Sequence, residues 1–131
     1  MQPNTDAGAE LRVAIVGAGL MGNWHAHAAT KSGATITAII DLDLNAAKML
    51  VSRYGGHAFT DFEQALEQAR FDIAHICTPL NTHVLLARQV LKARKHLIIE
   101  KPVAPTSKEV AELLALAGSQ NLLLCPVHQF A

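Results

Sequence analysis

This chain of 131 residues has few of the features that mark secreted, membrane or nucleic-acid-binding proteins. It holds only two cysteines, and 5% of its residues are aromatic. Its 11 basic residues balance 11 acidic ones, so no excess charge points to a nucleic-acid surface. No apolar run approaches the roughly 20 residues of a membrane span. The polar first ten residues lack the apolar segment of a secretory signal. These absences favour a cytoplasmic protein.

Apolar runs that alternate with helical patterns fill the rest of the chain. Half of the residues are apolar, and the length fits one domain with a sizeable core. The runs predict strands at 11–16, 35–41, 57–60, 72–77, 96–100 and 122–125. The helices are predicted at 20–31, 45–54, 61–69, 81–93 and 106–118. This order predicts an α/β fold: a doubly wound, mostly parallel six-stranded sheet of order 3-2-1-4-5-6, Rossmann-type, with helices on both faces.

Cys77 and Cys125 fall on the predicted fourth and sixth strands, with the fifth strand between them. At about 4.8 Å per strand, their Cα atoms would lie roughly 9–10 Å apart. A disulfide needs a separation within about 7 Å. We therefore expect two reduced thiols, which again favours the cytoplasm.

A glycine-rich turn follows the first strand and opens the first helix. Gly17 would allow the tight turn, Gly19 would let a phosphate approach the backbone, and Gly22 would let helix and strand pack closely. The N–H groups at the start of the helix, around Leu20 and Met21, would then meet the phosphates. The pattern predicts that residues 11–131 form a dinucleotide-binding domain after a disordered tail at 1–10. The alternative is a glycine turn without a ligand.

Asp41 ends the second strand, about 20 residues after the glycines, where this fingerprint places an acidic residue. Its carboxylate can accept hydrogen bonds from the adenosine ribose and would repel a 2′-phosphate. Leu42 follows, and no adjacent Arg or Lys is present to hold such a phosphate. The cofactor NAD is therefore favoured over NADP. Asp41 or Asp43 could instead cap the next helix, and both roles can coexist.

The end of the fourth strand carries a second group of polar residues. Thr78 offers a hydroxyl where the winding of the sheet reverses, and Pro79 stiffens the turn. Asn81 or Thr82 can cap the next helix, which places His83 in its first turn. His83 is thus a candidate cofactor contact, with a surface or capping histidine as the alternative.

Lys101 follows the fifth strand directly after Glu100. Pro102 restricts Lys101 to extended backbone and so fixes its direction. A cation beside a nicotinamide ring would serve hydride chemistry on an alcohol or ketone. The alternative is a solvated surface lysine.

The remaining histidines suggest no metal site. His25 and His27 are two residues apart on a helix, so they point to different sides. His75 lies in a buried strand and is expected to be hydrogen-bonded inside. The sequence holds no zinc-ligand set, so no metal is predicted.

Together these residues resemble the Gfo/Idh/MocA oxidoreductases, over residues 11–130. The resemblance rests on the glycine loop with His25 after it, Asp41, Thr78-Pro79 with His83, and Glu100-Lys101-Pro102. It implies that Lys101 sits beside the nicotinamide and assists proton transfer from the substrate hydroxyl. It also implies that Thr78, Pro79, His83 and Glu100 line the cofactor site, and that substrates are sugars, inositols or related polyols.

The chain departs from the family at its end. Members of the family usually continue into a second domain, which brings most substrate contacts and a catalytic histidine. Their His-x-x-Arg-Phe pattern lacks its arginine here, where His128-Gln129-Phe130 stands. Either the chain is a truncated or excised half, or it is a short protein with another task. We expect an NAD-binding domain, inactive in isolation, from an enzyme that transfers hydride between a sugar or polyol carbinol and nicotinamide.

The alternative is a stand-alone, non-catalytic nucleotide-binding or sensing module that self-associates. In either case Leu122, Leu124 and Phe130 would expose apolar surface beside the sixth strand, which predicts a homo-oligomer. No nucleic-acid or membrane partner is expected. A sugar or polyol partner is expected only together with a second domain.

Overall fold

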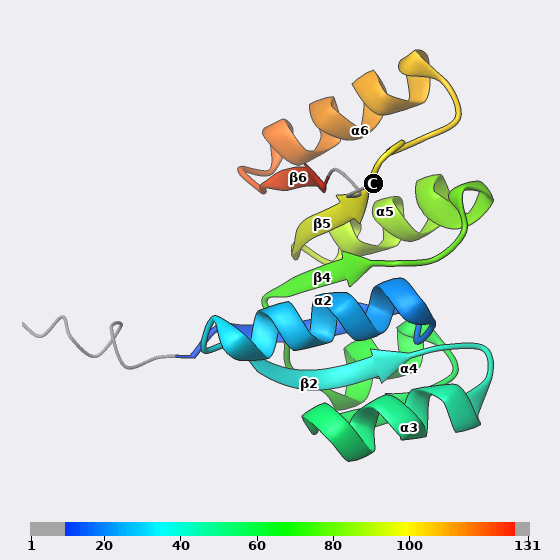
Figure 1. Cartoon of the computed structure of the whole chain (residues 1–131). Coiled ribbons are helices and arrows are strands. Elements are labelled where there is room, and N and C mark those ends of the chain that lie inside the picture. The colour runs from blue at the N-terminus through cyan, green and yellow to red at the C-terminus, as the bar shows by residue number, and fades with distance from the viewer. Residues whose placement is uncertain (1–9, 128–131) are drawn as a thin grey trace, which may run out of the picture.

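Strands and helices alternate along the computed structural model, which describes residues 10–127 (Figure 1). The strands are β1 (Arg12–Val16), β2 (Thr35–Ile40), β3 (His57–Phe59), β4 (Ile73–Ile76), β5 (His96–Glu100) and β6 (Leu124–Val127). The helices are α2 (Leu20–Lys31), α3 (Leu44–Tyr54), α4 (Phe62–Gln68), the 3-10 turn η1 (Leu80–Thr82), α5 (His83–Lys92) and α6 (Ser107–Ser119).

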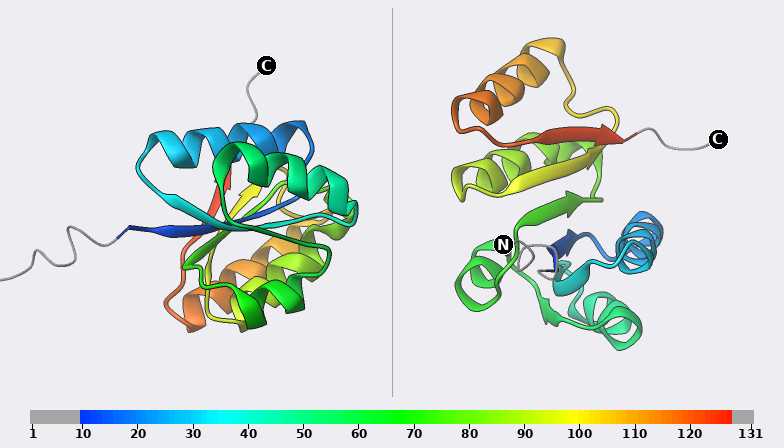
Figure 2. Two further views of the ribbon diagram at one scale, coloured as in Figure 1. Left: turned by 90° about the horizontal axis from the view of Figure 1, so that it is seen from below. Right: turned by 90° about the vertical axis from the view of Figure 1, so that its left-hand side faces the viewer.

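The six strands form one sheet of order β3-β2-β1-β4-β5-β6, and every neighbouring pair is parallel. The predicted fold class is therefore confirmed. Helices α2 and α3 cover one face, and α4, α5 and α6 cover the other (Figure 2). The winding reverses between β1 and β4, so ligands of such a sheet bind outside the carboxyl ends of these central strands.

Side chains of the strands alternate between two cores, one on each face of the sheet. On β1, Ala14 and Val16 join the core under α4, α5 and α6, whereas Val13 and Ile15 join the core under α2 and α3. Because both faces are covered, the strands read as continuous apolar runs rather than as an alternation. Packing of these side chains into the two cores fixes the position of each strand along the sheet. It therefore also fixes the position of the carboxyl end of each strand.

Two predicted elements differ from the structure by two residues at a boundary, and the others differ by at most one. Strand β6 begins two residues later than predicted and includes Pro126, which an edge strand tolerates because one side of its backbone needs no partner. The predicted helix at 81–93 opens as the turn η1, and Thr82 donates its hydroxyl to the carbonyl oxygen of Pro79 instead of capping α5. The predicted disordered tail lies outside the described residues, apart from Glu10.

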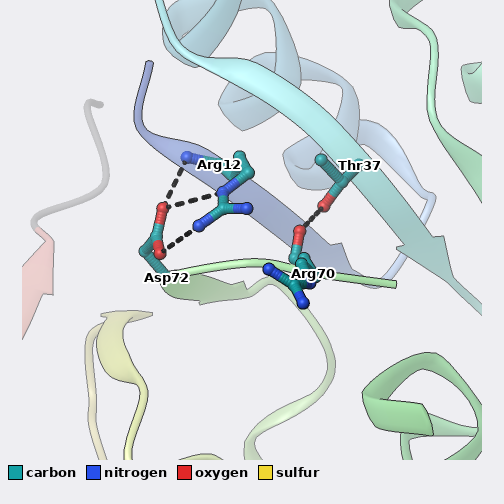
Figure 3. Close-up of polar contacts among 4 residues, drawn as sticks. All are labelled: Arg12, Thr37, Arg70 and Asp72. Carbon is teal, nitrogen blue, oxygen red and sulfur yellow. Dashed lines mark hydrogen bonds and ion pairs between the residues drawn. The ribbon is translucent and has the colours of Figure 1, made fainter. Parts of the chain in front are cut away.

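Polar contacts tie β1 and β4 together at the amino edge of the sheet (Figure 3). The backbone N–H of Arg12 donates to Asp72 at 2.9 Å, and its guanidinium forms an ion pair with the same carboxylate at 3.3 Å. Burial raises the pKa of Asp72, but the hydrogen bonds and charge of Arg12 outweigh it and leave the pKa below its ordinary value. Nearby, Thr37 donates its hydroxyl to the carbonyl oxygen of Arg70. These contacts support the end of the sheet opposite the predicted site.

Candidate functional site

The glycine turn between β1 and α2 is built so that only glycine fits at two of its positions. Gly17 adopts a φ of 104°, and a Cβ there would lie 2.7 Å from the carbonyl oxygen of Cys77. A Cβ on Gly22 would lie 1.8 Å from the carbonyl oxygen of Gly17. Gly19 differs, because nothing lies within 4 Å of its Cβ position. The predicted turn and packing roles of Gly17 and Gly22 are confirmed, and the side of the loop at Gly19 is open.

Helix α2 begins at this open side without a side-chain cap. Its N-cap is Gly19, and among the described residues no side chain caps it and no acidic residue occupies its first turn. The N–H groups of Leu20, Met21 and Gly22 cannot bond within the helix, because the first four amides of any helix lack carbonyl partners. These amides and the positive end of the helix dipole suit an anion such as a phosphate.

Asp41 lies beside the glycine turn and is half-buried. Its Oδ2 accepts a hydrogen bond from the N–H of Ala18 at 2.7 Å, and its Oδ1 accepts one from the N–H of Asp43 at 2.8 Å. Asp43, not Asp41, caps α3 by accepting from the N–H groups of Asn45 and Ala46. The carboxylate of Asp41 therefore orders the turn, while its remaining lone pairs can accept further hydrogen bonds.

The turn after β4 orients the hydroxyl of Thr78. The Oγ1 atoms of Thr78 and Thr82 lie 2.6 Å apart, and the hydroxyl of Thr82 donates its hydrogen bond to the carbonyl oxygen of Pro79. Thr78 is therefore the donor to Thr82. Its lone pairs can accept from a ligand, while Pro79 lies exposed at the rim.

His83 is buried, with 3% of its surface exposed. Its Nδ1 lies 3.0 Å from the carbonyl oxygen of Pro102 and 3.2 Å from that of Val103, and its Nε2 lies 2.9 Å from that of Thr78. The ring thus joins the turn after β4 to the turn after β5. It is not a surface histidine, and its predicted contact with a cofactor stays a prediction.

Glu100 ends β5 with its side chain buried under α2. Its Oε2 pairs with the Nε2 of His25, and the Nδ1 of His25 lies 2.9 Å from the Nδ1 of His75. The other carboxylate oxygen, Oε1, is buried and has no hydrogen-bond partner among the described residues. His75 is hydrogen-bonded inside, as predicted. Sequence reasoning missed these pairings, although His25 closely follows the glycine loop in the sequence.

Lys101 and Pro102 are exposed at the same edge, directly after Glu100. The N–H of Lys101 donates to the carbonyl oxygen of Val127 at 3.0 Å, which ties this turn to β6. The structure therefore brings the predicted site residues to the carboxyl ends of β1, β2, β4 and β5. A separate hollow of about 450 Å³ lies along β3 and includes none of them.

Within residues 10–127, no group of three or more His, Cys, Asp or Glu side chains is arranged to hold a metal ion. Both cysteines are free thiols, as predicted. None of the helices in the described part of the chain is both long and apolar enough to cross a bilayer.

Comparisons with known proteins point to one family. Residues 11–128 match the family model described as "Oxidoreductase family, NAD-binding Rossmann fold". Inositol 2-dehydrogenase of Leifsonia xyli subsp. xyli is 35% identical over 109 residues, which cover 82% of this chain and 32% of that protein.

Two solved structures share the fold closely. GenD2 from gentamicin A biosynthesis, in complex with NAD, superposes with a TM-score of 0.86 at 29% identity, over 89% of this chain and 34% of that one. The WlbA dehydrogenase of Chromobacterium violaceum, in complex with NADH and UDP-GlcNAcA, has a TM-score of 0.84 at 28% identity, over 90% and 35%. The chain spans about a third of the length of these relatives.

Proposed function

Because this chain belongs to the Gfo/Idh/MocA oxidoreductase family and forms its NAD-binding Rossmann domain, we propose that it binds NAD for hydride transfer between a sugar or polyol carbinol and the nicotinamide. The observation that carries the proposal is the start of α2, which is uncapped and open at Gly19. That end of the helix is suited to the pyrophosphate.

The two ends of the dinucleotide would then lie on opposite sides of the glycine turn. Asp41 lies on the β2 side, where its remaining lone pairs suit the hydroxyls of the adenosine ribose. The nicotinamide half would extend over the carboxyl ends of β4 and β5. There Thr78 offers an acceptor and Lys101 an exposed cation.

Lys101 is the proposed catalytic residue. When bound, NAD supplies the hydride acceptor. The lysine would hold the substrate hydroxyl and assist the departure of its proton, a role that typically contributes about 10²–10⁴-fold to the rate. Most substrate contacts would come from a second domain. We therefore expect negligible dehydrogenase activity from the 131-residue chain on inositols and common sugars, and steady turnover in a spectrophotometric assay would contradict this.

The preference for NAD over NADP rests on Asp41 and is tested by calorimetry with both dinucleotides. We expect tighter binding of NAD(H), because a 2′-phosphate would meet the carboxylate. Asp41→Asn keeps the shape of the side chain and removes its charge, so the preference should fall by about tenfold, or about 1.4 kcal/mol. Asp43→Asn, at the neighbouring cap, is the matched control. Equal or tighter NADP(H) binding by the unmodified chain would contradict the Asp41 argument.

Self-association is the second part of the proposal, and it also bears on the alternative of a non-catalytic sensing module. Leu122 and Leu124 are half-buried against the core, so their predicted exposure was wrong, whereas Leu123 is 68% exposed. Phe130 lies outside the described residues. Strand β6 pairs only with β5 in the described sheet, so its outer edge invites pairing. Light scattering at micromolar concentration should detect a dimer or larger species, and a clean monomer would refute this part. The cytoplasmic location stays a prediction.

A further inference from the structure

A buried polar cluster beneath the carboxyl edge has no part in the proposed function so far. It comprises His25 from α2, His75 from β4 and Glu100 from β5. The two imidazole rings meet edge to face, with centroids 5.2 Å apart at 89°. Only 10% of the His25 side chain and 8% of the Glu100 side chain are exposed. A buried ionisable cluster of this kind is costly unless its members compensate one another.

Two ionisable neighbours of the pair formed by His25 and Glu100 are uncharged near pH 7. Burial, and then the charge of His25, lower the pKa of His75 to about 4, so its ring is neutral near pH 7. Burial and the charge of Glu100 raise the pKa of the nearby Cys77 thiol, which therefore stays protonated. A histidine and a carboxylate that share one proton are neutral overall, and the pair carries one negative charge once that proton is lost.

The residues that pair with His75 on β1 and with Glu100 on β6 carry no charge. Ile15 of β1 lies beside His75, and Val127 of β6 lies beside Glu100. The first ionisable group after β5 is Lys101, exposed at the edge. The charge state of the buried pair therefore depends on its own proton, on the cation of Lys101 at the edge and on whatever binds above it.

The nicotinamide is the part of the cofactor whose charge changes. Its ring is cationic in NAD⁺ and neutral in NADH. With the adenosine on the Asp41 side, the ring would come to the ends of β4 and β5, where Glu100 is the last strand residue. In an interior of low dielectric constant, a cation there favours the negative state of the buried pair.

We propose that His25 and Glu100, supported by His75, make dinucleotide affinity depend on redox state: the pair releases its proton to solvent when NAD⁺ binds and keeps it when NADH binds. The inference rests on the proposed function. The step balances in charge, because the proton that leaves His25 is matched by the positive charge that arrives with the ring. His25 acts on the cofactor only through Glu100, so it is a positioning residue and not a catalytic one.

The test is calorimetric titration of the whole chain with NAD⁺ and with NADH, in two buffers of different ionisation enthalpy, from pH 6 to pH 8. NAD⁺ should release up to one proton more than NADH. Affinity for NAD⁺ relative to NADH should therefore rise with pH, by up to about tenfold per unit for one linked proton. His25→Asn and Glu100→Gln should each abolish this difference. His27→Asn, the same change at an exposed position of α2, should retain it.

A second readout on the unmodified chain guards against variants that fail to fold. The ¹⁵N shifts of the His25 ring should move towards the neutral form when NAD⁺ is added and should not do so with NADH. Equal proton release by the two cofactors, an unchanged His25 ring, or a folded His25→Asn that keeps the difference would overturn the inference alone. If neither dinucleotide binds, the proposed function fails as well, so the two failures are distinguishable.

Discussion

The half of the sheet formed by β1, β2 and β3 meets the proposed site differently from the half formed by β4, β5 and β6. The first half offers backbone amides and one carboxylate, with the open Gly19 between them. The second half holds buried ionisable side chains, namely His83 between two turns and Glu100, whose carboxylate pairs with His25 of α2 across the middle of the sheet.

This difference suits the two ends of a nicotinamide dinucleotide. The adenosine and pyrophosphate keep their charge through a redox cycle, so fixed amides and a fixed carboxylate are enough to hold them. The nicotinamide changes its charge, and it would lie over the half whose buried groups can respond. Within the first half, Gly17 and Gly22 shape the fold, whereas Gly19 is open towards the proposed ligand.

The largest effect is expected in the glycine turn, where two substitutions separate folding from binding. Gly22→Ala would put a Cβ 1.8 Å from the carbonyl oxygen of Gly17, so α2 must shift, at a cost of about 3 kcal/mol or more in the free energy of unfolding. A Cβ at position 19 would meet nothing within 4 Å, so Gly19→Val should leave the melting temperature nearly unchanged. Its side chain would block the phosphates and weaken NAD binding by about 100-fold, or about 2.7 kcal/mol.

Thermal denaturation and calorimetry on both variants check this expectation. Gly118→Ala, at an open glycine on α6 far from the turn, is the control and should leave binding unchanged. Tight NAD binding by Gly19→Val would mean that the phosphates do not approach the turn at this glycine.

The next effect lies in the second half, at His83. His83→Ala leaves a cavity and removes the partner of three carbonyl oxygens. The expected loss is about 3 kcal/mol in the free energy of unfolding. The exposed His57, changed in the same way, should cost less than about 0.5 kcal/mol. Urea denaturation measures both losses.

The His83 variant also tests whether this residue contacts the cofactor. NAD affinity is measured at a temperature where His83→Ala is fully folded. If His83 only supports the two turns and does not contact the cofactor, the variant should bind NAD nearly as tightly as the unmodified chain. A large loss of affinity in the folded variant would instead support the contact predicted from the sequence.

A smaller effect is expected from acid. Burial and the charge of His25 depress the pKa of His75 from 6.5 to about 4, so between these values the unfolded chain binds more protons than the folded one. The stability contributed by neutral His75 is complete above pH 6.5 and is lost as the pH falls towards 4, with a loss of roughly 2.5 kcal/mol at pH 4.5. His75→Asn should remove this part of the pH dependence in urea titrations at pH 7 and 4.5, whereas His27→Asn should retain it. An unchanged pH dependence in His75→Asn would contradict the assignment.

The same division explains what could be predicted from the sequence. The order of the strands follows from apolar runs separated by helical periods, which are local signals. The glycine turn and Asp41 obey a short fixed spacing, so their positions could be predicted too. The strand β6 was misplaced by two residues because Pro126 reads as the end of a strand, whereas at the edge of a sheet it is tolerated.

The buried contacts of the second half could not be predicted in this way. His25 and Glu100 are 75 residues apart, and His25 and His75 are 50 apart. Their contact depends on the register between β4 and β5 and on the height of α2 above the sheet. His83 was placed correctly in a first helical turn, but its burial depends on the path of the chain after Lys101. Neither feature produces a periodic pattern or a motif in the sequence.

The measurement that tests the account most directly is a ¹⁵N amide-shift titration of the chain with AMP and then with NAD⁺. The account predicts that AMP shifts the amides around Ala18 and Asp41 and leaves those of Thr78, Glu100 and Lys101 unchanged. NAD⁺ should shift both groups. Shifts by AMP at the β4 and β5 ends, or no shift at Ala18 and Asp41 with either ligand, would contradict the division of the site between the two halves of the sheet.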